Sequence, residues 1–424
     1  MPSSSFALLG TTVIKVDPQR PEAGAIAQAA AIIGRGGLVA FPTETVYGLG
    51  ADGLSAAAVE RIFAAKGRPA NNPLILHVTG LEQVEELGLV AGGDSPDSGG
   101  IPDVARDLAA AFWPGPLTLI MGRSEKVPDL VAANRPTFSC RAPNHPVALA
   151  LIRAAGRPLA APSANLSGRP SPVTAKHVLD DLAGRVDAVL DAGQTPLGIE
   201  STVLDLTVDP PRILRQGAVT KAELEAVLGS GRVAVATAEA PAVSQDHYRA
   251  RVPVYLVEWP DMPNQADRVD DLAARVALTA RELVEAQREE QQEQQERQEQ
   301  QERQERQERQ ERREQPGQQG QQGQQRQQIR EGARAVVTAK IGLLLTAETA
   351  AKLDPAAPPG ALEVVVMGSA ADPRSIAAEL YRLLRDLEAR GVAAIVIEGL
   401  APEGIGAVIM DRLRQAAGTR VIPC

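Results

Sequence analysis

The stretch from Leu38 to Val78 carries the side chains best suited to chemistry, because hydroxyls, cations, an amide and a histidine surround one short predicted helix. Ordinary core sequence does not need that mixture. Donors and positive charges in this combination favour an anionic ligand. The residues concerned are Thr43, Thr45, Lys66, Arg68, Asn72 and His77.

Two predicted strands and the helix between them must position these side chains. The apolar run Leu38–Phe41 predicts one strand, and Leu74–Val78 predicts the next. Between them, Ser55 is a suitable helix N-cap, and Gly67 ends the helix just past Lys66. Because open α/β sheets bind ligands at strand ends, we expect the site there.

Further polar clusters accompany later apolar segments. Several hydroxyls and at least four cations on separate strand ends suit the recognition of a triphosphate. The clusters are Ser163, Asn165, Ser167 and Ser171 within Pro158–Pro172, Ser201 and Thr202 within Ile199–Leu206, Arg215 within ILRQG, and Thr137 and Arg141 within TFSCRAPNHP.

Each of these residues also has a purely structural interpretation. Lys66 in the last helical turn could complement the helix dipole. His77 could be a satisfied strand residue, and Asn72 before a proline could belong to a turn. These interpretations leave Arg68 and the downstream clusters unexplained.

Gly48, Gly50 and Gly53 satisfy the pattern G-x-G-x-x-G and precede a predicted helix. A dinucleotide-binding fold also needs an acidic residue after the next strand, where this chain has LILHV. We therefore expect no dinucleotide site here. No Gly-Lys-Ser or Gly-Lys-Thr occurs either, which excludes a Walker A loop.

Several motifs, in their order along the chain, carry a family resemblance. They resemble the threonylcarbamoyl-AMP synthase family, with its YrdC-like domain, from about residue 12 to about residue 220. Residues 391–418 resemble the second domain of the long, two-domain form of that family. The motifs of the first part are PTETVYGLG, Lys66 with Arg68, WPGPLTLI, Ser163 with Asn165, GIESTV and LRQG.

The resemblance implies a synthase that joins L-threonine, bicarbonate or CO2 and ATP into threonylcarbamoyl-adenylate and releases pyrophosphate. A tRNA threonylcarbamoyl transferase of the TsaD type is then the expected partner, and adenosine 37 of tRNA the final acceptor. Mg²⁺ is expected on the ATP phosphates, without a dedicated protein cage. Carried over by position, the catalytic residues are Lys66, Arg68, Ser163 and Asn165; the ATP-binding residues are Arg68, Asn72, Thr137, Ser163, Ser171, Arg215 and Tyr248; and the L-threonine-binding residues are Thr45, His77, Arg141 and Ser201.

The expected fold class is α/β, with a YrdC-like twisted mixed-sheet domain over residues 1–232 and a smaller Rossmann-like α/β/α domain over residues 254–424. Strands and helices alternate after Val254, which predicts a mainly parallel second sheet. Few charged or hydroxylated residues gather at its strand ends, so we expect a structural, lid-supporting or partner-binding role.

Residues 233–253 lack a strong period and read as an interdomain linker over the active site. The family's linker pattern is degraded here, although His247 and Tyr248 remain. Tyr248 is therefore either a lid contact to ATP or a tyrosine that packs the linker down.

Between Ala286 and Ile329 the chain contains only Gln, Glu and Arg besides one proline and three glycines. We interpret residues 287–328 as a solvated, partly disordered insertion, because no apolar seam exists for a coiled coil. Pairs such as Glu302 with Arg306 could support an isolated charged helix in its first part. A partner-docking arm is the alternative.

The composition is typical of a soluble enzyme with two cores, because 44% of 424 residues are hydrophobic. Two cysteines, Cys140 and Cys424, argue against a disulfide framework. The first residues lack the features of a signal peptide, and no segment has about 18 consecutive apolar residues. We therefore expect a cytoplasmic protein without a membrane contact.

A YrdC-like RNA-binding or ribosome-maturation module without catalysis is the alternative function. Its cation-lined concavity could hold RNA phosphates, including those of double-stranded RNA. The net charge of -9 and the presence of only two tryptophans argue against it. Threonine-dependent release of pyrophosphate would separate the two functions.

Overall fold

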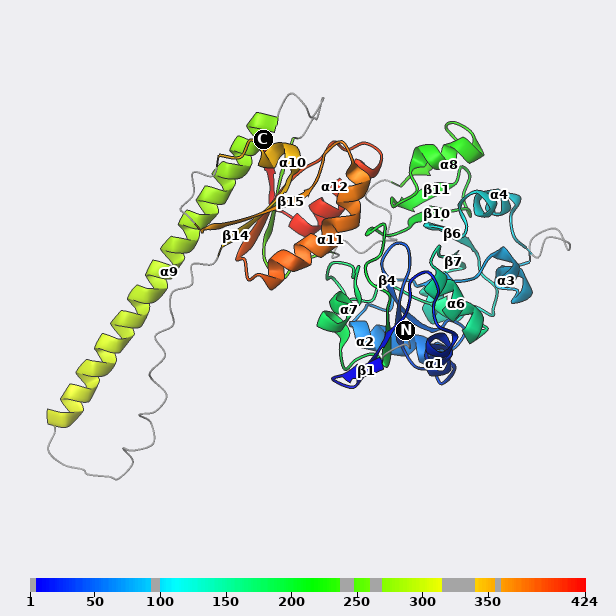
Figure 1. Cartoon of the computed structure of the whole chain (residues 1–424), viewed down its shortest axis with the longest axis horizontal. Helices are drawn as coiled ribbons and strands as arrows, with labels where there is room; N and C mark the ends of the chain where they lie inside the picture. The colour runs from blue at the N-terminus through cyan, green and yellow to red at the C-terminus, as the bar shows by residue number, and fades with distance from the viewer. Residues whose placement is uncertain (1–4, 93–99, 237–247, 260–268, 315–339, 355–359) are drawn as a thin grey trace.

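The computed structural model describes residues 5–92, 100–236, 248–259, 269–314, 340–354 and 360–424. The chain forms two bodies, each built on its own sheet, and one long helix projects from the second body away from the first (Figure 1). His247 and residues 315–328 of the insertion lie outside the described residues.

In the described part of the chain, the first sheet has twelve strands in the order β1-β2-β9-β3-β4-β8-β5-β7-β6-β10-β11-β12. It is mixed, since β6 pairs parallel with β10 and antiparallel with β7. This confirms the expected fold class of the first domain. The strands are β1 (Ser5–Leu8), β2 (Thr11–Lys15), β3 (Val39–Pro42), β4 (Tyr47–Asp52), β5 (Ile75–His77), β6 (Leu117–Gly122), β7 (Thr137–Arg141), β8 (Leu159–Ala160), β9 (Ala188–Asp191), β10 (Thr202–Asp205), β11 (Arg212–Arg215) and β12 (Ala234–Val235).

Helices pack against both faces of this sheet. Val39 and Phe41 of β3 belong to an apolar cluster with α1 and α6, whereas Leu38 and Ala40 belong to a second cluster with α2, α4 and α7. Alternation along one strand thus supplies two cores. The helices of this body are α1 (Ala23–Gly34), α2 (Ala56–Lys66), α3 (Leu81–Glu86), α4 (Asp103–Phe112), α5 (Asp129–Ala132), α6 (Pro146–Ala155), α7 (Ala175–Leu182) and α8 (Lys221–Leu228).

The second sheet has the order β15-β14-β16-β13-β17, and each of its described pairs is parallel. Apolar residues of α9 cover one face, and α11 and α12 cover the other, on the side of the first body (Figure 1). The expected α/β/α arrangement is therefore confirmed. The elements are β13 (Val254–Glu258), α9 (Val269–Glu314), β14 (Ile341–Thr346), α10 (Ala347–Ala350), β15 (Leu362–Gly368), α11 (Pro373–Ala389), β16 (Ala394–Glu398), α12 (Ile405–Ala417) and β17 (Val421–Pro423).

Helix α2, which carries Lys66, follows the expected local rules. The Ser55 side chain accepts a hydrogen bond from the backbone N–H of Ala58, and Gly67 ends the helix with φ of 62°. This left-handed conformation suits glycine. The strand predicted over Leu74–Val78 is β5, shortened by one residue at each end.

The glycine pattern at positions 48, 50 and 53 is a packing feature. Gly48 and Gly50 lie inside β4, an internal strand paired with β3 and β8. A Cβ at Gly50 would lie 2.7 Å from the Phe41 ring, and one at Gly53 would lie 2.9 Å from the Pro158 carbonyl oxygen. The glycines therefore allow close contacts between neighbouring chain segments.

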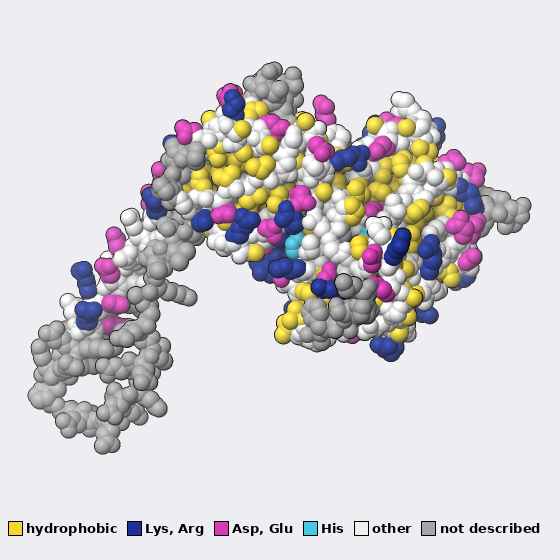
Figure 2. Space-filling view, in the orientation of Figure 1, with side chains coloured by type: hydrophobic (Ala, Val, Ile, Leu, Met, Phe, Trp, Pro, Cys, Tyr) yellow, Lys and Arg dark blue, Asp and Glu magenta, His cyan; other side chains and the backbone are white. Residues whose placement is uncertain are grey.

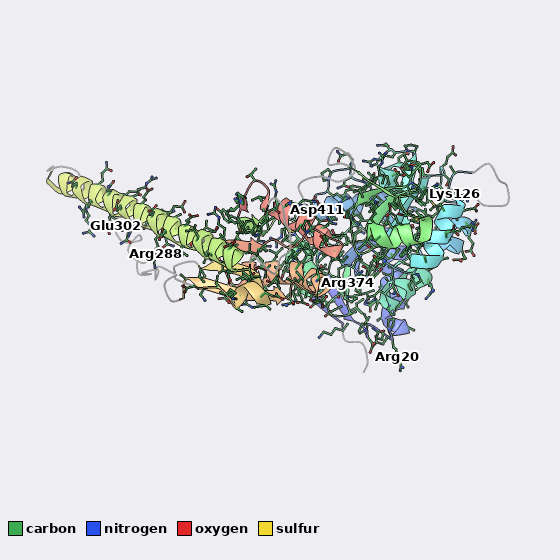
Figure 3. All side chains as sticks on the ribbon, turned by 90° about the horizontal axis from the view of Figure 1, so that it is seen from above. Arg20, Lys126, Arg288, Glu302, Arg374 and Asp411 are labelled. Carbon is green, nitrogen blue, oxygen red and sulfur yellow. The ribbon has the colours of Figure 1, made fainter. Side chains whose placement is uncertain are left out.

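The first part of the insertion continues α9 to Glu314. Figure 2 shows cationic, anionic and uncharged polar side chains along this projecting helix, and Figure 3 places Arg288 and Glu302 on it. The expected pair of Glu302 and Arg306 forms at 3.9 Å. No helix in the described ranges is both long and apolar enough to cross a membrane.

Candidate functional site

A pocket in the first body gathers most of the predicted site residues. It encloses about 1140 Å³ of space, a volume that includes solvent at its mouth. Neither Lys66 nor Thr137 lines it. The predicted residues that do line it are Thr45, Arg68, Asn72, His77, Arg141, Ser163, Asn165, Ser171, Ser201, Arg215 and Tyr248.

Arg68 and Arg215 bring two cations to one side of this pocket. Arg68 donates to the backbone carbonyls of Asn72 at 3.2 Å and Pro73 at 3.0 Å, and Arg215 donates to the Ser201 carbonyl at 2.8 Å. Burial and then the charge of Arg215 lower the pKa of Arg68 to about 10. Among the residues that the structure describes, no carboxylate forms an ion pair with either guanidinium. Two charges held this way favour an anion between them.

Lys66 fixes the loop that presents Ser163 and Asn165. Its ammonium group donates to the backbone carbonyls of both residues at 2.5 Å and is buried. Burial, followed by the charge of Arg68, lowers the pKa of Lys66 well below its usual value. Lys66 is therefore not an exposed partner of the helix dipole. In this conformation its side chain acts on the site indirectly, by holding the backbone of the loop that carries Ser163 and Asn165.

The side chains of Ser163 and Asn165 are themselves tied together. Ser163 Oγ donates to Asn165 Oδ1 at 2.5 Å, and Asn165 Nδ2 donates to the carbonyls of Leu166 and Arg169. Ser163 also bridges to Gly48 of β4 through the backbone. The Ser-x-Asn segment is thus a rigid polar wall rather than a loose loop.

Arg141, at the end of β7, is a further cation of the pocket lining. It donates to Thr45 Oγ1 at 3.0 Å and to the Gly115 carbonyl at 3.1 Å. Its Nη2 lies 2.6 Å from Glu44 Oε2, in an ion pair whose angles are poor for a hydrogen bond. Glu44 and Thr45 therefore fix the direction of the guanidinium.

His77 ends the neighbouring strand β5, which pairs with β7 so that His77 lies opposite Arg141. Burial and then the charge of Arg141 lower the pKa of His77 to about 3. The imidazole is consequently neutral at pH 7. It can offer hydrogen bonds to a ligand without adding charge.

The segment just before β10 forms another part of the pocket wall. Ser201 Oγ lies 2.8 Å from Thr118 Oγ1, and Ser171 Oγ donates to Glu200 Oε1 at 2.7 Å. Glu200 lines the pocket and is buried. A carboxylate in the wall of a cationic pocket was not expected from the sequence.

Tyr248 closes the pocket from the linker. It has φ of 66°, an unusual conformation for a tyrosine, and its ring stacks on Tyr381 with centroids 5.4 Å apart. Burial raises its pKa to about 12. Tyr248 both lines the pocket and packs the linker onto the second body, and its contact to ATP stays a prediction.

Sequence reasoning missed several residues of the site. Arg135 and Ser139, two positions to either side of Thr137, line the pocket where Thr137 does not. Glu44 and Glu200 lie inside the motifs PTETVYGLG and GIESTV. The motifs therefore contain both carboxylates, but nothing in the sequence shows that these residues pair with arginines. In the described part of the chain, no three His, Cys, Asp or Glu side chains form a metal cluster.

Comparison with known proteins gives a family for both bodies. Residues 31–217 match the family described as telomere recombination, and residues 219–418 match the C-terminal domain of threonylcarbamoyl-AMP synthase. The threonylcarbamoyl-AMP synthase of Pyrococcus abyssi is 36% identical over 419 residues, covering 97% of this chain and 99% of the relative. The Bacillus subtilis threonylcarbamoyl-AMP synthase is 36% identical over 413 residues, covering 96% of this chain and 95% of the relative.

A solved structure is similar over both bodies. The crystal structure of P. abyssi Sua5 complexed with L-threonine has a TM-score of 0.72 at 34% identity, covering 97% of this chain and 99% of that chain. The similarity therefore extends to the second body as well as to the first.

Proposed function

Because this chain belongs to the threonylcarbamoyl-AMP synthase family, a family of enzymes, we propose that it makes L-threonylcarbamoyladenylate from ATP, L-threonine and bicarbonate or CO2. The observation that carries the proposal is the pair Arg68 and Arg215, two half-buried guanidinium groups of the pocket that form no ion pair with a carboxylate among the described residues. A phosphate chain supplies the missing negative charge.

The reaction asks little covalent work of the protein. The amine of threonine takes up CO2 as a carbamate, and a carbamate oxygen then attacks the α-phosphorus of ATP. A bond from that oxygen to phosphorus forms, the bond from the α-phosphorus to the bridging oxygen breaks, and pyrophosphate leaves. Catalysis then consists of positioning and of stabilising charge on the phosphates.

The pocket offers a distinct set of groups to each substrate. In the proposal, Arg68 and Arg215 hold the phosphates, with Asn72, Ser163, Asn165 and Ser171 along the wall. Arg141 supplies positive charge for the carboxylate of threonine, while Thr45, neutral His77 and Ser201 supply hydrogen-bonding groups. The relative whose structure contains L-threonine supports L-threonine as a ligand of this chain.

Magnesium enters the proposal as part of the Mg·ATP substrate. The pocket carboxylate, Glu200, is already engaged by Ser171, Tyr381 and Arg412, so the wall offers the metal no free ligand set. Phosphate oxygens and water are then its ligands. We further propose that the product passes to a tRNA threonylcarbamoyl transferase for modification of adenosine 37, in the cytoplasm.

The test is release of pyrophosphate from ATP, magnesium and bicarbonate, measured with each amino acid in turn. We expect a signal selective for L-threonine and dependent on bicarbonate. Equal signals with all amino acids, or binding of RNA without any release of pyrophosphate, would refute the proposal and favour a binding module.

A further inference from the structure

Two side chains of the second body reach the wall of the pocket. Tyr381 of α11 and Arg412 of α12 both contact Glu200, which is 6% exposed. The Tyr381 hydroxyl lies 3.2 Å from each carboxylate oxygen, and Arg412 Nε donates to Oε2 at 3.1 Å. In Figure 3, Asp411, the neighbour of Arg412, lies on the side of the second body that faces the first. The second body therefore supplies partners for a pocket residue.

Glu200 needs those partners if the pocket is to hold a phosphate chain. Burial by itself opposes ionisation of Glu200, but the charges of Arg412 and then Arg215 lower its pKa below the usual value. The carboxylate is therefore ionised, and its charge is offset mainly from the second body. Without Arg412, a buried negative charge would face an anionic ligand, which is unfavourable in a site of low dielectric.

Arg412 is built into the boundary between the bodies. It is 1% exposed, and its Nη2 donates to the carbonyl of Gln216 at 2.8 Å, next to Arg215. Its guanidinium also lies over the Tyr248 ring, 5.1 Å from the centroid. The Tyr248 ring, on a residue with φ of 66°, therefore contacts both a cation and the stacked ring of Tyr381 from the second body.

We propose that Arg412 and Tyr381 are positioning residues of the nucleotide site, and that the second body thereby sets the affinity for the phosphates of ATP. They offset the charge of Glu200 and hold the Tyr248 ring in the pocket lining. The inference rests on the proposed function and deepens it, because it gives the second body a role in substrate binding.

The experiment is a double-mutant cycle in the full chain with Arg412→Gln, Glu200→Gln and both together. Calorimetry would measure the dissociation constants for Mg·α,β-methylene-ATP and, separately, for L-threonine. We expect Arg412→Gln to weaken nucleotide binding by about tenfold or more and threonine binding by less than about threefold. Glu200→Gln in the same chain should restore most of the lost nucleotide affinity, because it removes the unpaired charge.

A merely structural role predicts a different pattern. Loss of both ligands together, with no recovery in the double variant, would overturn the inference. Arg374→Gln is the matched control, since Arg374 of α11 pairs across the same boundary with Glu223 at 3.2 Å, and neither residue lines the pocket. We expect it to leave the melting temperature nearly unchanged and nucleotide affinity within about twofold.

Two further measurements keep the outcomes distinct. If Arg412→Gln fails to fold, Tyr381→Phe removes only the hydroxyl at Glu200 and should still weaken nucleotide binding by about threefold, and unchanged binding would overturn the inference. If the unaltered chain binds no nucleotide, the proposed function itself fails. If it binds nucleotide and folded Arg412→Gln binds equally well, only the inference fails.

Discussion

Arg68 and Arg215 hold positive charge in the pocket by bonding to backbone carbonyls instead of carboxylates. Carbonyl acceptors fix the direction of a guanidinium without cancelling its charge. The pocket is thus prepared for an anion before the anion arrives. Such preorganisation is what charge stabilisation in phosphoryl chemistry requires.

Replacing Arg68 with Lys tests the shape of this contact separately from its charge. Lysine keeps the positive charge but loses the planar fork, so it cannot bond to Pro73 and to a phosphate with the same geometry. We expect ATP binding to weaken by about tenfold, with a melting temperature close to that of the unaltered chain. Calorimetry measures the ATP affinity, and thermal melts measure the melting temperature. Unchanged ATP affinity would show that only the charge matters.

Lys66 gives a second prediction, because its buried ammonium group serves two carbonyls of the Ser-x-Asn loop. Lys66→Ala leaves both acceptors unsatisfied, and we expect a loss of about 2 to 4 kcal/mol in the free energy of unfolding together with a fall in activity. Urea unfolding measures the loss of stability, and pyrophosphate release measures the fall in activity. Full stability combined with a rate loss of about a hundredfold or more would instead place the ammonium on the phosphates during turnover.

The pH dependence of stability provides the third prediction. The pKa of His77 falls from 6.5 in the unfolded chain to about 3, and that of His177 falls to about 4. Below pH 6.5 these histidines bind protons in the unfolded chain but stay neutral in the folded chain. The free energy of unfolding therefore falls as the pH drops toward the folded-state pKa values. Above about pH 7 these groups do not affect it.

His77→Gln should therefore reduce this slope by up to ~1.4 kcal/mol per pH unit, and His177→Gln should act alike. Urea unfolding between pH 7 and pH 4 compares the variants with the unaltered chain. Identical slopes in all three chains would contradict the buried, neutral state assigned to these histidines.

At the scale of elements, α9 combines two different kinds of helix. Its first turns pack Leu272, Val276 and Val284 against the second sheet, whereas the Gln/Glu/Arg part has exposed side chains. Only the first part buries apolar surface, which is the main source of helix stability in proteins. The second part is held by local pairs that contribute little each.

Deleting residues 287–328 should accordingly leave synthesis of the adenylate within about twofold of the full chain. The melting temperature should also change little. The matched control replaces Leu272 and Val276 with Asp, which places charges among buried apolar residues and should unfold the second body. Loss of most activity on deletion would show that the projecting helix docks a partner or supports the fold.

Local rules account for the elements that could be predicted from the sequence. Ser55, Gly67 and the apolar strand runs act through neighbours a few residues away, and β5 and α2 formed as expected. The places of Arg68 and Arg215 in the pocket lining could be predicted, because arginines at the end of a helix and of a strand rarely serve a core. The direction of Lys66 was not, because it depends on a loop 97 to 99 residues further along the chain.

At the scale of the whole molecule, the least predictable feature is the boundary between the bodies. Glu200 meets Tyr381 and Arg412 across 181 and 212 residues of chain, and the second body shows no motif that announces either contact. Packing there is close, since a Cβ at Gly198 would lie 2.5 Å from the Ala378 carbonyl oxygen. The lid-supporting role expected for the second body fits these contacts, but its residues could only be found in three dimensions.

Truncation tests this boundary directly. Cutting the chain after Ala236 keeps β12 on the edge of the first sheet and leaves both apolar clusters of that sheet intact. The fragment should therefore fold, because it retains its own cores. It should be less stable than the same region in the full chain, because Val46, Val173 and Ile199 lose their apolar neighbours in the second body.

Turnover of this fragment should be weak, for an electrostatic reason. Removal of Tyr381 and Arg412 takes from Glu200, a carboxylate of the pocket lining, its cationic partner and a hydroxyl partner, while Tyr248 is lost altogether. Glu200→Gln within the fragment should then recover part of the ATP affinity, whereas Glu223→Gln, which neutralises the partner of Arg374 away from the pocket, should recover none. Pyrophosphate release measures the turnover of these fragments, and calorimetry measures their ATP affinity. A fragment that turned over like the full chain would show that the second body does not act on the site.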